Sequence, residues 1–238
     1  MSGHSKWANI KHKKAKEDSA KGKTFTKLVK ELTIAAREGG GDATGNPRLR
    51  FLMEKARSVN MPIDNVTRAI KKGTGELEGV HYEEIRYEGY GPSGTAVVVE
   101  VVTDNKNRSV ADIRHVFSKH GGNLGANGVV LWMFEHKGVI RATGNMSEDD
   151  LLEKLLDYNI DDVSSHDNSF TITCDAHDLE VIKAAVQKTG LKVEDAAVEW
   201  LAKNTVNVDD KNQEEKVFKF LGALEDLEDV QNVYTNLA

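Results

Sequence analysis

Residues 82–103, with the sequence YEEIRYEGYGPSGTAVVVEVVT, mark the point where the chain changes from helical to extended structure. Apolar residues here alternate with polar ones or form a valine-rich run, and both patterns are typical of β-strands. The glycines and the proline in segment 89–94 predict a turn, because these residues supply the backbone angles that tight turns need. We therefore expect strands at 82–90 and 95–103, joined by that turn.

Beyond this stretch, helical and extended periods alternate. We expect a helix at about 108–119, a glycine-rich turn at 121–128 and a strand at 129–134. The next segment has the β-α-β-β-α-β order of a ferredoxin-like fold, with elements at 138–142, 147–158, 160–165, 169–174, 177–189 and 191–199. A last helix and a short strand ending at Tyr234 lack a complete core, so we expect them to pack back on the sheet of residues 80–135.

Upstream, residues 24–73 predict three short helices that share one small core. The first runs from about Thr24 to Glu38 and stops at three consecutive glycines. The second opens at Asn46-Pro47, because asparagine caps a helix well and proline suits its first position. The third begins near Pro62 and ends with Lys71-Lys72-Gly73, and its expected buried residues are Ile63, Val66 and Ile70.

These elements predict an α+β protein of three domains, with an N-terminal three-helix domain followed by two α+β domains. One α+β domain is ferredoxin-like and is inserted in the other. We expect a basic tail plus helical domain at 1–75, a discontinuous α+β domain at 76–136 and 205–238, and the inserted domain at 137–204.

Composition favours a soluble protein of the cytosol. Apolar residues make up 39% of the chain, and no stretch is long and apolar enough to span a membrane. The N-terminal lysines are not followed by the apolar segment of a secretory signal. Cys174 is the single cysteine, which excludes an intramolecular disulfide and fits a reducing compartment.

Charge is distributed very unevenly. Residues 1–72 hold 17 Lys and Arg against 7 Asp and Glu, a net charge of +10, whereas residues 73–238 hold 15 against 31, a net charge of −16. Such asymmetry indicates that the basic segment 1–72 binds a polyanion. The alternative is that this segment only neutralises the acidic body, which is residues 73–238. The candidate nucleic-acid-binding residues are Lys6, Trp7, Lys11, Lys13, Lys14, Lys16, Lys21, Lys23, Lys27, Lys30, Arg37, Arg48, Arg50, Arg57, Arg68, Lys71 and Lys72.

Some of these residues have structural alternatives. Trp7 either stacks on a base or anchors the tail, which is residues 1–23, to the helical domain. Alone, this tail has too few apolar residues to form a core, and we expect it to order against a partner. Lys71 and Lys72 also complement the dipole at the end of their helix.

No pattern indicates catalysis, a metal or a cofactor. His115 and His120 lack the glutamate of a zinc-protease motif, and Cys174 lies in an apolar strand where cysteine usually packs in a core. The glycine-rich segment 121–128 follows a helix and lacks the Gly-Lys-Ser/Thr ending of a phosphate loop. The aromatic signature of RNA-recognition motifs is absent from the ferredoxin-like segment. We therefore expect a protein that is not an enzyme.

Several segments resemble the YebC/PmpR family, in its order and spacing: MSGHSKWANIKHKK (1–14), GGGDATGNPRLR (39–50), YEGYGP (87–92), TDNKNR (103–108) and GGNLG (121–125). The resemblance extends over essentially the whole chain and implies one helical and two α+β domains. It also implies a regulator of gene expression, because bacterial members are described as probable DNA-binding transcriptional regulators. Mitochondrial relatives are translational activators of a cytochrome oxidase subunit, and some bacterial members are linked to ribosomes stalled on proline-rich stretches.

Three hypotheses of function follow. The first is a non-enzymatic DNA-binding transcriptional regulator, and the second is a translation factor that binds ribosomal RNA. Phosphates are alike in the two targets, so charge alone does not choose between them. The third, from a different class, is a protein-interaction module that binds no nucleic acid. No small-molecule substrate or membrane partner is expected.

Overall fold

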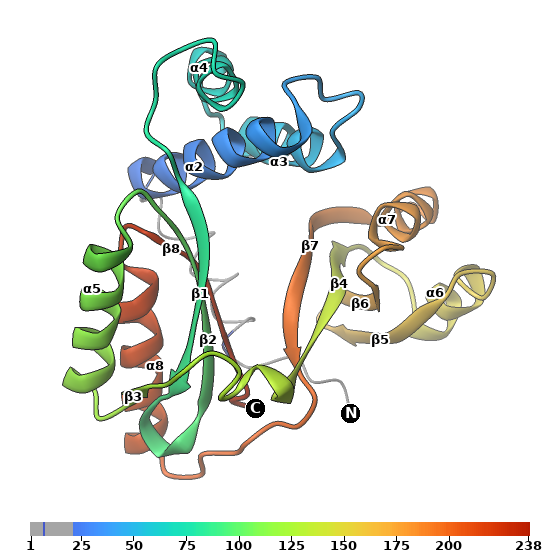
Figure 1. Ribbon diagram of the computed structural model, residues 1–238. Helices are drawn as coiled ribbons and strands as arrows, with labels where there is room; N and C mark the ends of the chain where they lie inside the picture. Colours follow the sequence, from blue (N-terminus) through green and yellow to red (C-terminus); the bar gives the residue numbers. More distant parts are fainter. Residues whose placement is uncertain (1–6, 8–20) are drawn as a thin grey trace.

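The computed structural model describes Trp7 and residues 21–238, and Figure 1 shows an α+β protein of three domains. Three helices form the N-terminal domain, which lies across the top of the view. Two antiparallel four-stranded sheets stand below it, with their helices on the outer sides. Among the described residues, no helix has the length and apolar character needed to cross a membrane.

The N-terminal domain consists of α2 (Lys21–Gly39), α3 (Pro47–Ser58) and α4 (Ile63–Gly73). As predicted, Asn46 caps α3: its side chain accepts a hydrogen bond from the Leu49 amide at 3.0 Å. The Asn46 amide group also donates to the Ala35 and Gly40 carbonyls, at 2.8 and 2.9 Å, and so ties the start of α3 to the end of α2. One core joins the helices, formed mainly by Leu28, Leu32, Leu49, Leu52 and Val66.

One buried position in α4 was predicted wrongly. Ile63 is 61% exposed, and Ala69 is buried beside Val66 instead. Helical side chains lean toward the N-terminus of their helix, so the side chain of the first residue projects past the packed interface. At the other end, Gly73 fits closely against α2, because an added Cβ would lie 2.3 Å from the Thr33 carbonyl oxygen.

The first sheet has the order β3-β1-β2-β8. It contains β1 (Glu83–Tyr90), β2 (Ala96–Thr103), β3 (Asn123–Leu124) and β8 (Val230–Thr235). The predicted hairpin is present, with β1 and β2 paired from Glu83 opposite Thr103 to Tyr90 opposite Ala96. Helices α5 (Lys106–Lys119) and α8 (Lys211–Glu225) cover one face of this sheet. β8 pairs with β2, so the C-terminal helix and strand return to this sheet.

The inserted domain is ferredoxin-like, as predicted, with strand order β5-β6-β4-β7. Its core is formed by Ile140, Phe170, Ile172 and Cys174 with residues of the two helices, and burial raises the pKa of the Cys174 thiol to about 11. Its elements are β4 (Phe134–Thr143), α6 (Glu148–Lys154), β5 (Ile160–His166), β6 (Ser169–Asp175), α7 (Leu179–Lys188) and β7 (Lys192–Ala202).

The strand predicted at 129–134 is not formed. Residues Leu131–Met133 make a 3-10 turn instead, and β4 begins only at Phe134. The buried carboxylate of Glu88 explains the difference. It accepts hydrogen bonds from the amides of Gly128, Val130 and Leu131 at 2.9, 3.1 and 2.9 Å, which fold the backbone around it. This turn connects the two α+β domains.

Candidate nucleic-acid interface

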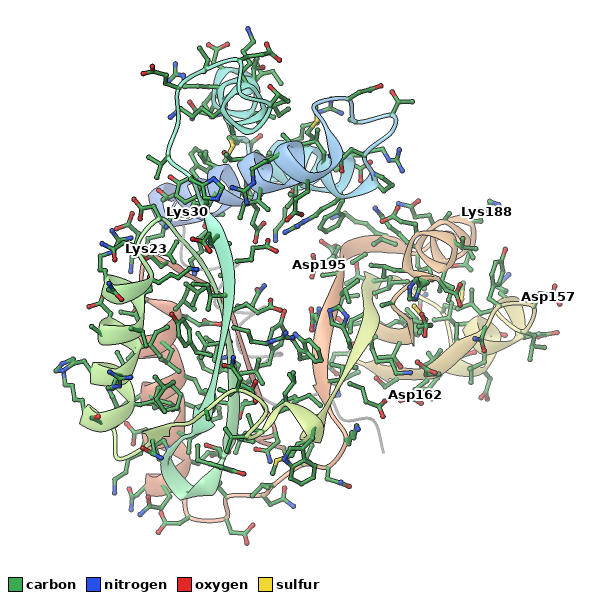
Figure 2. The ribbon with its side chains drawn as sticks, viewed as in Figure 1. Lys23, Lys30, Asp157, Asp162, Lys188 and Asp195 are labelled. Atoms are coloured by element: carbon green, nitrogen blue, oxygen red, sulfur yellow. The ribbon has the colours of Figure 1, made fainter. Side chains whose placement is uncertain are left out.

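Three lysines of α2 lie against the first α+β domain. Lys23, Lys27 and Lys30 share one side of the helix by their spacing. They meet the segment 225–229 (Glu-Asp-Leu-Glu-Asp) between α8 and β8, here called the acidic turn. The Lys23 ammonium lies 2.9 Å from the Asp226 carboxylate, and Lys27 donates to the Glu225 carbonyl at 3.2 Å. Figure 2 shows Lys23 and Lys30 where α2 meets this domain.

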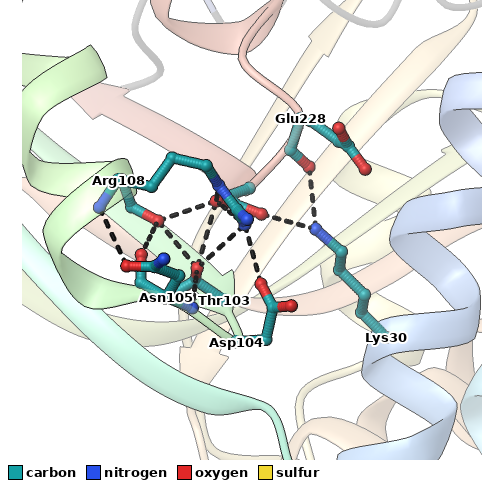
Figure 3. Close-up of polar contacts among 8 residues, drawn as sticks. Lys30, Thr103, Asp104, Asn105, Arg108 and Glu228 are labelled. Carbon is teal, nitrogen blue, oxygen red and sulfur yellow. Dashed lines mark hydrogen bonds and ion pairs between the residues drawn. The ribbon is translucent and has the colours of Figure 1, made fainter. Parts of the chain in front are cut away.

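The contact of Lys30 is buried. Its ammonium donates to the Asp229 carboxylate at 2.7 Å and to the Glu228 carbonyl at 3.3 Å (Figure 3). The side chains of Lys30 and Asp229 are only 5% and 7% exposed. Arg108 and the Ser109 hydroxyl donate to the other carboxylate oxygen, at 2.8 and 2.7 Å. Asp229 therefore holds two cations and links the helical domain to the first α+β domain.

The charge state of this centre is fixed. Burial works to raise the pKa of Asp229, but hydrogen bonds from Lys30, Arg108 and Ser109 outweigh it and lower the pKa to about 2. The carboxylates of Asp229 and Asp104 raise the pKa of Arg108 above its usual value. At neutral pH both Asp229 and Arg108 are therefore ionised.

The segment TDNKNR (103–108) has a structural role in this centre. Asn105 caps α5 by accepting a hydrogen bond from the Arg108 amide at 3.1 Å. The Thr103 hydroxyl contacts both Asp229 and Ser109. Sequence reasoning missed Ser109 and Asp229, and the available signal was this conspicuously polar segment between a strand and a helix.

Two predicted arginines are also engaged within the chain. Arg37 donates to the Tyr82 carbonyl at 2.7 Å, just before β1. Arg48 forms ion pairs with Glu38, at 2.9 Å, and with Glu84 of β1. Together with the lysines of α2, they hold the helical domain on the first α+β domain.

The helical domain also contacts the inserted domain. The Lys183 ammonium of α7 lies 3.3 Å from the Glu54 carboxylate of α3 and 5.3 Å from the centre of the Phe51 ring. The side chain of Lys183 is only 14% exposed. The helical domain therefore lies on both α+β domains.

Trp7 belongs to neither predicted environment. It is 5% exposed and lies in the core of the first α+β domain. Its ring stacks on the Phe218 ring of α8, with 6.1 Å between the two ring centres. This position covers the faces that a base would need, and the anchor is the first α+β domain, not the helical one. Lys21 begins α2, and the predictions for Lys6, Lys11, Lys13, Lys14 and Lys16 lie outside the described residues.

The remaining candidates are exposed. Arg57, Arg68, Lys71 and Lys72, here called the outer cations, have no ion-pair partner within residues 21–238. Three of them belong to α4, which lies on the side of α2 away from the sheets (Figure 1). Arg50 is exposed and makes only long contacts, of 3.3 and 3.5 Å, with two backbone carbonyls. Exposed Lys55 of α3 was not among the predicted residues.

A groove lies beside the outer cations, between α2 and α4. Its volume is about 310 Å³, and its lining residues are Phe25, Thr26, Val29, Asn65, Arg68, Ala69 and Lys72. Elsewhere, within the part of the chain that the structure describes, no group of three or more His, Cys, Asp or Glu side chains is placed to hold a metal ion. The groove and the outer cations are thus open to a ligand in the helical domain.

The fold and its charges define a three-domain α+β protein in which a basic helical domain is fastened by ion pairs to two acidic α+β domains. Residues 5–76 match the TACO1/YebC protein N-terminal domain, and residues 82–237 match the TACO1/YebC second and third domain. The chain belongs to the TACO1/YebC family.

Full-length relatives agree with this assignment. A probable transcriptional regulatory protein of Chlorobaculum tepidum is 54% identical over 100% of this chain and 95% of its own length. One of Desulfosudis oleivorans is 52% identical over 99% of this chain and 96% of its own length. The crystal structure of a conserved hypothetical protein of Aquifex aeolicus is similar with a TM-score of 0.85 and 45% identity, over 93% of this chain and 91% of that one.

Proposed function

We propose that this protein is a non-enzymatic regulator of gene expression that binds DNA through the outer cations of its helical domain. The observation that supports this most directly is the division among the basic residues. Lys23, Lys30, Arg37 and Arg48 are engaged within the chain, whereas the outer cations are exposed and have no ion-pair partner in the described part. The names of the relatives, probable transcriptional regulatory proteins, support regulation of transcription.

The position of the outer cations suits contact with a large polyanion. α4 lies at the far side of the helical domain, so a duplex can approach it without meeting the acidic α+β domains. Lysine and arginine bind phosphates and release condensed counterions, which makes affinity depend steeply on salt. Four phosphate contacts predict a reduction of about 150-fold in affinity between 50 and 200 mM salt, at a log–log slope of about −0.9 per contact.

The test measures binding of the full chain to a labelled DNA duplex by fluorescence anisotropy over that salt range. Neutralising the four outer cations to glutamine should weaken binding and make the salt slope shallower by about 0.9 for each phosphate that is no longer neutralised. The matched control neutralises four exposed cations of the α+β domains, Arg114, Lys119, Lys154 and Lys188. Equal effects of the two sets, or binding that does not respond to salt, would contradict the proposal.

The ribosomal RNA hypothesis is tested with the same variants. In the same anisotropy assay, a structured RNA with as many phosphates as the duplex replaces the DNA probe. Competition between the RNA and the DNA then compares their affinities for the protein. Preference for the RNA at equal salt would move the target from DNA to RNA. Absence of binding to both, at any salt, would favour a protein-interaction module.

A further inference from the structure

The groove between α2 and α4 has an apolar floor and a basic rim. Phe25, Val29 and Ala69 supply the floor, and Arg68 and Lys72 stand at its edge. The two helices touch closely where Gly73 meets Thr33. The groove lies along the first half of α2 and along α4 from Asn65 to Lys72. Phe25 is half-buried, so part of its ring remains accessible.

The polar groups of the groove are unused. Within the described residues, the side chains of Asn65, Arg68 and Lys72 make no hydrogen bond or ion pair, whereas Lys23 and Lys30, on α2, bind the acidic turn. An amide and two cations therefore offer hydrogen-bond donors to a negatively charged group of a ligand. The apolar floor suits a flat apolar part of the same ligand.

We propose that this groove binds one unpaired nucleotide of a nucleic acid, with its base against Phe25 and its flanking phosphates at Arg68 and Lys72. Asn65 is placed to hydrogen-bond the base edge, since an amide both donates and accepts. This inference rests on the proposed function and adds that the bound nucleic acid has a single-stranded or flipped base at this site.

Size and chemistry both favour a nucleotide. A volume of about 310 Å³ is at the lower end of the range for small-molecule pockets, about 300–1,000 Å³, and suits a group the size of one nucleotide. A nucleotide combines a ring that stacks on an aromatic side chain with the phosphate that two cations attract. An acidic peptide side chain carries the charge without the ring.

The test compares two DNA probes with the full-length protein. One is a blunt duplex, and the other is the same duplex with a short single-stranded overhang that contains 2-aminopurine, whose fluorescence is quenched when it stacks. Wild-type protein should quench the overhang probe. Phe25→Leu keeps an apolar side chain but removes the ring. It should abolish quenching and weaken overhang binding by about 5- to 150-fold, the value of one stacking interaction of about 1–3 kcal/mol, with blunt duplex binding unchanged.

Two further variants keep the test sharp. Phe51→Leu changes another half-buried phenylalanine of the same domain, outside the groove, and should leave both probes unaffected. Thr26→Glu places a carboxylate at an exposed position of the groove without adding a ring, so it should repel the flanking phosphates and weaken overhang binding even if Phe25→Leu is poorly folded.

Each outcome has a definite meaning. If the blunt duplex binds but the overhang is not quenched, or Phe25→Leu behaves as Phe51→Leu, the groove does not hold a base and the proposed function stands. If neither probe binds, both proposals fail. A third outcome is that the 2-aminopurine fluorescence is never quenched and an acidic peptide displaces the overhang probe but not the blunt duplex. The groove is then a peptide site, and this inference is overturned.

Discussion

Replacing Asp229 by asparagine should destabilise the protein strongly, because this carboxylate is the acceptor for two cations in a buried site. The Asp229→Asn change would keep the size of the side chain but leave Lys30 without its counter-charge and Arg108 with Asp104 alone. The side chain of Lys30 is 5% exposed, so water does not replace the missing partner. Removing one member of a buried ion pair costs about 3–5 kcal/mol.

The pKa of Asp229 gives an independent magnitude. Its shift from 3.8 to about 2 corresponds to about 2 kcal/mol of folding free energy, at about 1.4 kcal/mol per unit. Because the pKa is lower in the folded state, this stability is fully present above pH 4 and is lost as the pH falls from about 4 toward 2. The asparagine variant lacks the group that titrates, so its difference from wild type should shrink over the same interval.

The assay is urea unfolding followed by circular dichroism, at pH values from 7 to 2. The matched control is Asp226→Asn in the same acidic turn, whose ion pair with Lys23 is exposed at both ends and is worth about 0–1 kcal/mol. The reasoning is refuted if the Asp229 variant loses no more stability than the Asp226 variant at pH 7. A difference that stays constant down to pH 2 would refute the assignment of the pKa.

Three other substitutions and one chemical modification have defined outcomes. Glu88→Gln replaces one acceptor oxygen by a donor that faces backbone amides, so urea unfolding should show a loss of about 1–3 kcal/mol. Gly73→Ala places a methyl group against the Thr33 carbonyl and should cost about 1–3 kcal/mol in thermal unfolding. Gly222→Ala, in open space within α8, should instead stabilise by about 0.5–1 kcal/mol, and equal effects of the two would contradict the packing argument. Cys174, with a pKa of about 11, should react with a thiol reagent at pH 8 only after unfolding, and rapid reaction of the native protein would show that the site is open.

Helices and strands that are determined by residues close together in the chain were predicted well from the sequence. The Asn46-Pro47 start of α3 depends on a cap that lies within three residues, and the hairpin of β1 and β2 depends on alternation and one turn. The ferredoxin-like order follows from the succession of periods, and the observed strand order agrees with it. In each case the residues that determine the element are neighbours in the chain.

Features set by distant residues were not predictable in the same way. The turn at Leu131–Met133 replaces a strand because Glu88, about forty residues earlier, accepts its amides. Trp7 packs on Phe218, which no local pattern of the basic tail indicates. The partner of Lys30 is Asp229, at a separation of 199 residues, and a lysine that binds an internal carboxylate looks the same in sequence as one that binds a phosphate.

This ambiguity changes what the net charge of the N-terminal third means. Residues 1–72 have a net charge of +10, but part of that positive charge forms ion pairs that hold the domains together. Lys23, Lys30 and Arg48 form ion pairs with Asp226, Asp229 and Glu84. Part of the positive charge of residues 1–72 is therefore neutralised by the negative charge of residues 73–238. Within residues 21–72, the contribution to the salt dependence of DNA binding should therefore come mainly from the outer cations, with a slope nearer to four contacts than to the twelve basic residues of that range.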